Sequence, residues 1–366
     1  MSRNRVIYQS EALWVSQQYD STGSADHEQL RRVQSANYSF SVSRQDINQY
    51  GQLARIDALV LESPTVSFDF SYYVTDGRNE RALGFYVQTG GASQGGFASG
   101  HMTNESGRNF FVVTAPEGED LNGQALANTE SVIGIGNGFL SDYTLEASVG
   151  SIPTASVSIE ALNIRSDTGA AAINHPAVVP QSGTSLTDTV VLPNAEAGTG
   201  ASIITALRPG DIVLSFGDFE TDGTGQIVTL NGNDAAHVQS FSLSLPLART
   251  ALEKLGSRFA YARSVDFPVT ASLSVNAIVN EIDEKNLVDL LDDEKERNIS
   301  MTLKDPDGGT GLIVTLQGCV LQDESYSSAI GSNKSVDLTF TAQIGGPNDS
   351  AHNVLVSGSN SDALFA

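Results

Sequence analysis

The sequence has almost no cysteine, few basic residues and no long apolar run. Cys319 is the single cysteine among 366 residues, which excludes a disulfide scaffold and a zinc or redox site built on paired cysteines. No stretch approaches the ~20 apolar residues of a membrane span, and the start of the chain, Met1 to Tyr8, lacks the apolar core of a signal peptide. We therefore expect a soluble protein, made in the cytoplasm, with no membrane partner.

Positive charge is scarce throughout the chain. The 20 Lys and Arg residues face 43 Asp and Glu residues, which gives a formal net charge of −23, and both halves have an acidic excess. Such a surface repels phosphate backbones. Tight nucleic-acid binding is therefore not expected, whereas contact with a nucleic acid that does not adhere is compatible with the composition.

Helical patterns are also few, and alternation of apolar and polar residues dominates. Leu247–Leu255, which is followed by Gly256, and residues 283–296 predict two short helices. Alternation with a period of two is typical of half-buried antiparallel strands. It occurs at residues 65–72, 155–161, 269–277 and 336–342. The sequence predicts a mainly β fold with short flanking helices.

Similar segments recur in the same order in the two halves, which favours an internal duplication. The matches are Ser39–Ser43 with Ser240–Ser244, Gly51 with Gly256, Pro64 with Pro268, Leu140–Asp142 with Leu321–Asp323, and Val149–Ser151 with Ile330–Ser332. The stretches that end at Gly51 and Gly256 have a helix-like pattern. The alternative is that short Ser and Val patterns recur by chance in any β-rich chain.

The duplication predicts two tandem modules. We place the first at residues 1–165, a connector at 166–200, the second at 201–346 and a flexible C-terminal tail at 347–366. The first module carries about 24 extra residues, because the offset between matching segments falls from 205 to 181 and then 179. A glycine-rich stretch predicts that the extra residues form a long loop at 87–108. This loop contains Thr89, Gly90, Gly91, Gly95 and Gly96.

The chain offers no convincing active site. Its histidines lack the spacing of a metal pair; they are His27, His101, His175, His237 and His352. Cys319 lies in an apolar strand pattern, so we expect a buried small side chain and not a nucleophile. We predict that the protein is not an enzyme and has no cofactor.

Three acidic or glycine-rich segments resemble ligand sites weakly. Gly134–Gly138 lacks the spacing of a phosphate-binding loop, so a turn is favoured. Asp218, Glu220 and Asp222 resemble the start of a calcium loop, but Thr229 stands where that loop needs Glu. They are weak metal candidates. The acidic residues of 283–294 form either a solvated helix face or an electronegative surface with a function.

The segment Gly138–Asn163 resembles a pattern found in tail tube proteins of tailed bacteriophages. In that pattern a strand ends at Val149 and Gly150, a turn contains Pro153, and an alternating strand leads to Asn163. The second half keeps the Ile330-Gly331 pair and the following strand but lacks the proline and the final Asn.

The resemblance implies a fold and a role. Each module would be a β-sandwich or part-barrel with a flanking helix, and modules would share sheets to form stacked six-fold rings. Three copies of a two-module chain would form one pseudo-six-fold ring, and loop 87–108 would contact the next ring. The implied protein is a major tail tube subunit in the virion, assembled in the host cytoplasm, whose acidic lumen conducts DNA during ejection without binding it tightly.

The same resemblance implies partners. These are the chain itself and other tail proteins: a terminator, a tape measure protein, and a sheath if the tail contracts. Two alternatives stay open. One is another tail component, such as a terminator, distal tail or baseplate protein. The other is an acidic β-rich module that binds calcium or a carbohydrate.

Overall fold

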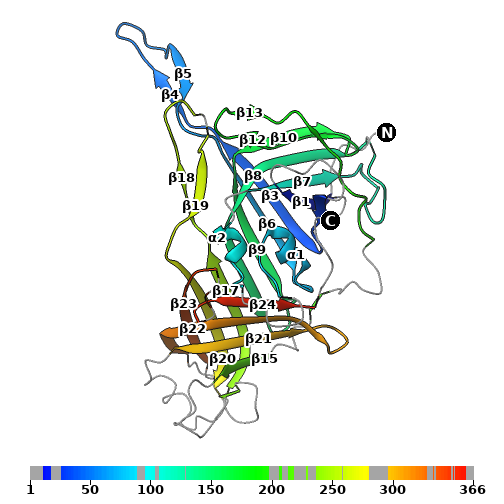
Figure 1. The fold of residues 1–366 in the computed structure, drawn as a ribbon, viewed down its shortest axis with the longest axis vertical. Coiled ribbons are helices and arrows are strands. Elements are labelled where there is room, and N and C mark those ends of the chain that lie inside the picture. The colour runs from blue at the N-terminus through cyan, green and yellow to red at the C-terminus, as the bar shows by residue number, and fades with distance from the viewer. Residues whose placement is uncertain are drawn as a thin grey trace.

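Long antiparallel strands run through both halves of the chain (Figure 1). The computed structural model describes residues 11–17, 26–88, 95–103, 107–127, 129–197, 206–207, 213–217, 228–229, 236–257, 259–279, 296–327, 333, 335–347, 349 and 351–359. The mainly β prediction is confirmed. None of the described helices is long and apolar enough to cross a membrane.

The described part of the first half contains ten strands and two short helices. The strands are β1 (Glu11–Gln17), β2 (His27–Gln29), β3 (Val33–Ser41), β4 (Arg44–Ile47), β5 (Asp57–Val60), β6 (Thr65–Tyr73), β7 (Arg108–Thr114), β8 (Ser131–Ser148), β9 (Thr154–Ala161) and β10 (Asn163–Thr168). The helices are α1 (Arg78–Leu83) and α2 (Ser99–Thr103).

Short strands connect this half to the second. They are β11 (Ile173–Asn174), β12 (Val178–Val179), β13 (Thr184–Ser185) and β14 (Thr189–Val190). The second half contains β15 (Val213–Gly217), β16 (Val228–Thr229), β17 (Ala236–Pro246), β18 (Arg249–Leu252), β19 (Ala262–Val265), β20 (Val269–Val279), β21 (Arg297–Lys304), β22 (Thr310–Ser327), β23 (Ser335–Ile344) and β24 (Val354–Gly358).

Eight strands form one long antiparallel sheet in the order β3-β6-β9-β8-β17-β20-β23-β22. Each half contributes four neighbouring strands, and their order is the same in both halves. The halves join where β8 pairs with β17. We refer to this eight-stranded sheet as the long sheet and to the β8–β17 pairing as the in-chain joint. The described sheets do not close into a barrel.

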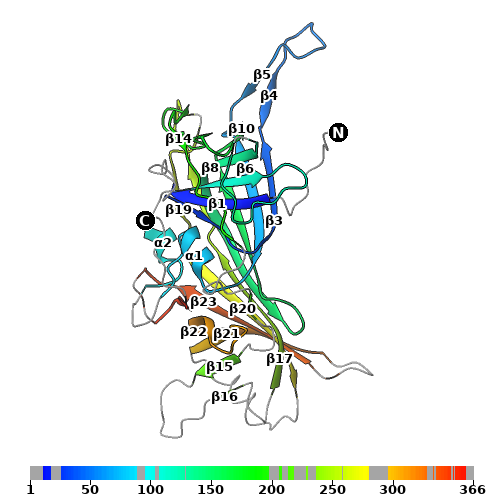
Figure 2. The same ribbon diagram turned by 90° about the vertical axis from the view of Figure 1, so that its right-hand side faces the viewer.

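The long strands β8 and β22 each leave the long sheet and enter an outer layer. The first part of β8 pairs with β7 and β10, and the first part of β22 pairs with β21 and β24. Asn137 and Gly318 stand at these two changes of layer, and both have positive φ, 55° and 63°. Figure 2 shows β1, which extends the first outer layer, lying across the long strands.

The strand pairing gives the two modules a common numbering. Arg44 faces Val60 in the β4–β5 hairpin, and Arg249 faces Val265 in the β18–β19 hairpin, so the offset is 205. The β8 and β9 strands match β22 and β23 at an offset of 181, as Leu140 matches Leu321. We call residues related in this way equivalent.

The pairing corrects the match read from the sequence. Tyr38 pairs with Phe68, and Leu243 pairs with Leu273, so Tyr38 is equivalent to Leu243. The match of Ser39–Ser43 with Ser240–Ser244 is therefore four residues out of register. An alternating Ser pattern resembles itself after every shift of two residues, so sequence similarity cannot set the register.

The extra residues of the first module fall in two connections. Phe110 pairs with Ile135 and Ile299 pairs with Leu316, so β7 matches β21 at an offset of 189. The offset falls from 205 to 189 between β6 and β7, and from 189 to 181 between β7 and β8. The predicted total of about 24 residues agrees with these offsets, but part of it lies after β7 and not in 87–108.

The helix predicted for Leu247–Leu255 is wrong. These residues form β18 and the turn of the β18–β19 hairpin, in which Gly256 has a φ of +86°. Leu247 is buried instead at the base of the hairpin. A nine-residue helix has little intrinsic stability, so pairing with a strand beyond the turn outweighs the local pattern. The helix predicted at 283–296 lies outside the described residues, apart from Glu296.

The connector and the C-terminal segment pack against the rest of the chain. Ile173, Val190 and Leu192 cover Trp14 and Phe111 in a second core, so the described part of 166–200 is an ordered layer. The expectation of a flexible tail over 347–366 is wrong for residues 354–358. These form β24, because Val354 and Val356 are buried when β24 pairs with β22.

Candidate functional site: the polar face and the edges of the long sheet

The two faces of the long sheet differ completely in chemistry. One face is packed in the main core, with aromatic and aliphatic side chains from both modules. The other face carries Ser, Thr, Asn, Asp and Glu. None of the eight strands, as described, contains Lys or Arg. The alternation in the sequence already predicts an apolar and a polar face, but the lack of Lys and Arg becomes visible only once the strands are known.

Small hydroxyl side chains cover much of the polar face. Ser35 and Ser71 have hydroxyl oxygens 2.7 Å apart, and those of Ser39 and Ser67 are 2.8 Å apart. These cross-strand pairs satisfy one another locally and leave no bulky protrusion. This part of the surface is therefore polar and small-featured.

Six carboxylates give this face its charge. The strands of the first module place four of them there, and those of the second module place two: Asp69, Asp142, Glu146, Glu160, Asp323 and Asp337. Burial raises the pKa of Asp142, and the bond from the Thr144 hydroxyl, 3.2 Å long, partly offsets this rise. The carboxylates are thus more numerous on the first module, where Arg263 pairs with one of them, Glu160.

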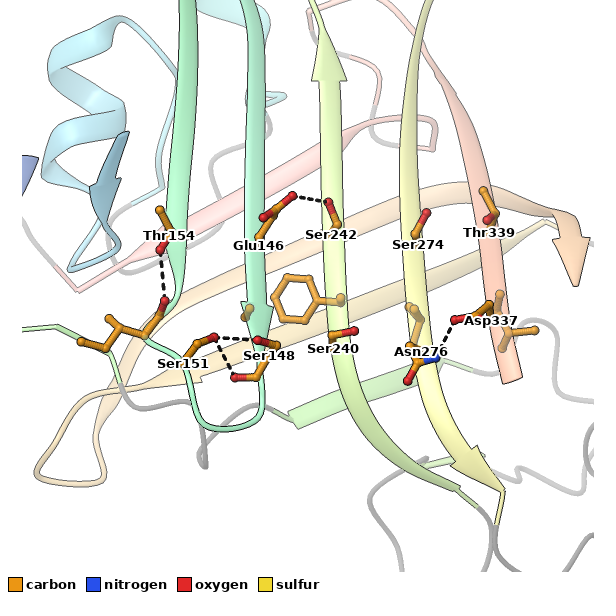
Figure 3. Close-up of a pocket in the computed structure, with 15 residues that line it drawn as sticks. Glu146, Ser148, Ser151, Thr154, Ser240, Ser242, Ser274, Asn276, Asp337 and Thr339 are labelled. Atoms are coloured by element: carbon orange, nitrogen blue, oxygen red, sulfur yellow. Dashed lines mark hydrogen bonds between the residues drawn. The ribbon is translucent and has the colours of Figure 1, made fainter. Parts of the chain in front are cut away.

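The polar face is hollowed at the in-chain joint (Figure 3). The hollow has a volume of about 480 Å³. Glu146 accepts a hydrogen bond from Ser242 across the joint, at 3.4 Å, and Asn276 donates to Asp337 at 2.5 Å. The concave polar surface therefore continues from one module to the other without a break.

The long sheet ends in two open edges. Among the described strands, β3 pairs only with β6, and residues 320–327 of β22 pair only with β23. Phe40 on β3 is 67% exposed, whereas its equivalent Leu245 is 0% exposed. On β22, Tyr326 is 47% exposed, whereas its equivalent Leu145 is 1% exposed. Both edges thus expose apolar side chains that the in-chain joint buries.

The β18–β19 hairpin lies over the in-chain joint. The Arg249 guanidinium donates to the carbonyl oxygens of Leu140, at 3.4 Å, and of His101, at 3.3 Å. It also lies 5.5 Å from the centroid of the Phe139 ring. Arg263 forms an ion pair of 2.6 Å with Glu160. The hairpin therefore joins the second module to two strands of the first.

Burial shifts the pKa values of two titratable groups beneath this hairpin. Burial, together with the nearby Arg249 and Arg108, lowers the pKa of His101 to about 3. Burial lowers the pKa of Arg108 to about 10. His101 is therefore neutral at physiological pH, and its ring packs edge-on against Phe85 at 4.7 Å.

The described ends of the predicted 87–108 loop bind the chain's own C-terminal segment. Gln88 exchanges backbone hydrogen bonds with β24, and the Gly96 N–H donates to the Pro347 carbonyl at 3.2 Å. Gly96 is buried against the Asn353 side chain, which leaves no room for a Cβ atom. Thr89, Gly90 and Gly91 lie outside the described residues. Gly95 lies beside the Tyr86 ring.

The residues that carry the tail tube resemblance form a turn and the start of a strand. Val149 and Gly150, whose φ is +83°, lie in the β8–β9 turn. Buried Pro153 accepts a hydrogen bond from the Val74 N–H at 3.0 Å. Asn163, at the start of β10, donates to the Pro176 carbonyl at 2.7 Å. The turn thus connects β9 to β8, the strand that pairs with β17 at the in-chain joint.

The second module does have an Asn at the position of Asn163. Asn163 pairs with Gly136, and the Gln317 N–H, equivalent to that of Gly136, donates to the Asn353 carbonyl at 2.8 Å. The sequence analysis missed this match because the connection before β24 is longer than the one before β10.

Gly134–Gly138, for which a turn was expected, lies within the strand β8. Asp218, Glu220 and Asp222 lie outside the part of the chain that the structure describes. Within that part, no group of three His, Cys, Asp or Glu residues could hold a metal ion. Cys319 is buried in β22, as its apolar strand pattern predicted.

Comparison with known proteins gives weak structural matches, and two of them are described here. No family model matches the chain, and no curated protein matches its sequence. A chain from the tail of an empty GTA particle, refined helically with C6 symmetry, is 18% identical and has a TM-score of 0.26; the match covers 38% of this chain and 96% of that one. A chain from a native gene transfer agent virion is 17% identical with a TM-score of 0.26, covering 41% and 98%. A likeness this low carries no argument about fold or function.

Proposed function

We propose that this protein is a structural subunit of the tail tube of a phage-like particle, in which three copies form a ring. One observation carries the proposal: each open edge of the long sheet repeats one side of the in-chain joint. The β3 edge is equivalent to β17, and the β22 edge is equivalent to β8. A second copy therefore offers the strand that each edge lacks, and repetition of the joint closes a ring.

The polar face of the long sheet would line the lumen of that ring. Its carboxylates repel DNA phosphates. Its eight described strands contain no Lys or Arg that would attract them. Its short hydroxyl side chains do not protrude far enough to obstruct a passing duplex. DNA would pass through stacked rings without tight binding, as the tail tube role requires. No catalytic group is needed.

The equivalence also predicts the register between copies. Ser244 pairs with Thr144 at the in-chain joint, so Ser39 of one copy should face Ser325 of the next. Tyr38 should then face Tyr326 in the same ladder. These pairs would bury the apolar side chains that are exposed in the single chain. The contact of loop 87–108 with the next ring stays a prediction, as do the terminator, tape measure and sheath partners.

Electron microscopy and cysteine cross-linking together test this proposal. Purified protein should show rings or tubes with a central hole, and the Ser39→Cys, Ser325→Cys double variant should form disulfide-linked oligomers on oxidation. Directly opposed residues on antiparallel strands have Cα atoms about 4.5–5.5 Å apart, which suits a disulfide. Buried Cys319 should not compete.

The matched control is Ser41→Cys with Ser327→Cys. In the predicted register these residues are four positions apart, about 13 Å along the strand, so they should not link. A protein that stays monomeric at every salt and protein concentration would refute the proposal. Rings that never stack would favour a tail terminator instead, and equal linking of both variants would refute the register.

A further inference from the structure

The two hairpins that extend from the long sheet are equivalent, but only one of them packs against another part of the chain. We call the surface on which a hairpin packs its seat. The β4–β5 hairpin connects β3 to β6, and the β18–β19 hairpin connects β17 to β20. Arg44 is equivalent to Arg249, and Gly51 to Gly256, each glycine with a φ of +86°. Any contact made by one hairpin therefore predicts a contact for the other.

The seat of β18–β19 is formed by the first module. Phe139 and Glu160 are cross-strand neighbours beneath the hairpin, and they contact Arg249 and Arg263. Farther along the hairpin, Glu253 accepts a hydrogen bond from Ser63 at 3.0 Å. The hairpin thus crosses the first module from the in-chain joint to the base of β4–β5.

The β4–β5 hairpin, in contrast, stands away from the rest of the molecule in Figures 1 and 2. Its Val60 is 48% exposed, whereas the equivalent Val265 of the β18–β19 hairpin is 7% exposed. Its ion pair between Arg55 and Asp46, 2.9 Å long, lies within the hairpin itself. An exposed apolar extension of this kind indicates a surface that a partner covers.

The second module contains an open groove where the equivalent seat should be. Val320 and Thr341 line this groove. They are cross-strand neighbours and are equivalent to Phe139 and Glu160. The groove has a volume of about 590 Å³, and the carboxylates of Glu296 and Asp349 lie at its wall. The first module's seat is thus filled by β18–β19, whereas the second module's seat is open.

We infer that the β4–β5 hairpin of one copy occupies this groove in the second module of its neighbour and latches the ring. The inference rests on the proposed ring, because it takes the neighbour's position from the in-chain joint. Arg44 would donate to the carbonyl oxygen of Leu321 in the neighbour, as Arg249 donates to that of Leu140. The ion pair between Arg263 and Glu160 has no counterpart at this seat, because the equivalent residues are Ala58 and Thr341. Arg44 would therefore make the main polar contact of the latch.

Two measurements on the full chain test the latch. First, Arg44→Ala should raise the protein concentration needed for ring assembly about tenfold, which corresponds to the loss of a hydrogen bond from a charged donor. The control, Arg55→Ala, removes the same charge from the same hairpin, but Arg55 has no cationic equivalent in β18–β19. It should change the assembly concentration less than about twofold.

Second, a short bismaleimide reagent should join Ala58→Cys of one copy to Thr341→Cys of the next in assembled rings. The monomeric double variant should not react in this way. Rings without this link, or equal effects of Arg44→Ala and Arg55→Ala, would overturn the latch and leave the ring standing. If the unmodified chain never assembles, the proposed function fails and the latch fails with it.

Discussion

Equivalent strands form the in-chain joint and the open edges of the long sheet. They are paired with one another at the joint and lack a partner at the edges. At the joint, β8 and β17 cover one another and bury Leu145 and Leu245. At the edges, their equivalents Tyr326 and Phe40 are exposed. The strand order is the same in both halves, and the edges differ from the joint in lacking a partner strand. A module of this design therefore needs a neighbour on both sides, and the chain supplies one of the two.

Truncation of equivalent apolar residues should give the largest contrast. In the monomer, Leu245→Ala should lower the free energy of unfolding by about 2–5 kcal/mol, because it leaves a cavity in a closed core. Phe40→Ala should cost less than about 0.5 kcal/mol, because its ring is exposed there. Urea denaturation below the assembly concentration measures both.

Assembly should reverse that order. Phe40→Ala should weaken ring formation although the monomer remains stable, because the side chain becomes buried only between copies. Equal losses of monomer stability for the two variants would contradict the comparison between joint and edge.

A buried polar cluster is present in the first module and not at the equivalent described positions of the second. Its loss should give the next largest effect on stability. Tyr72 and Tyr143 both donate to one oxygen of Glu80, at 2.9 and 3.3 Å, whereas the second module has Ala277 and Glu324 at the tyrosine positions. Glu80→Ala should cost about 1–3 kcal/mol, since it leaves buried phenol groups without their acceptor. Thermal unfolding of Tyr72→Phe provides the control, because it removes only one donor.

The same cluster predicts a pH dependence. Burial raises the pKa of Glu80 above its ordinary value of 4.5. The folded state then holds the proton more tightly than the unfolded state, so stability falls as the pH rises from about 4.5 toward the raised pKa. The variant Glu80→Gln should lack this decline. Parallel stability curves for the two proteins between pH 4.5 and 7.5 would count against it.

The ion pair between the β18–β19 hairpin and β9 should give the smallest effect. Arg263 is 4% exposed and Glu160 is 54% exposed, so solvent screens the pair. Glu160→Gln should cost about 0.5–1 kcal/mol and less at high salt. Thr341→Gln, at the equivalent position of the open seat, should leave the stability of the monomer unchanged. A larger loss for Thr341→Gln would show that the seat is occupied within the chain.

Much of the sheet could be predicted from the sequence. Val66, Phe68 and Phe70 are buried and their alternate neighbours exposed, because alternation along a strand is a local property. The hairpins could not be predicted. Leu247–Leu255 has the local spacing of a helix, but its strand partner lies after the turn. The open seat at Val320 and Thr341 could not be predicted either, because it depends on the equivalence of two distant hairpins.

By itself, the sequence determined the mainly β class, the repeated order of segments and the negative charge of the polar face. Alternation and composition are local properties that do not depend on which strands pair. The tertiary structure decided the register of the repeat, the joint that pairs β8 with β17, and the edges that stay open. These depend on hydrogen bonds between strands about a hundred residues apart in the sequence. A Ser-rich strand can satisfy such bonds in several registers until the core selects one.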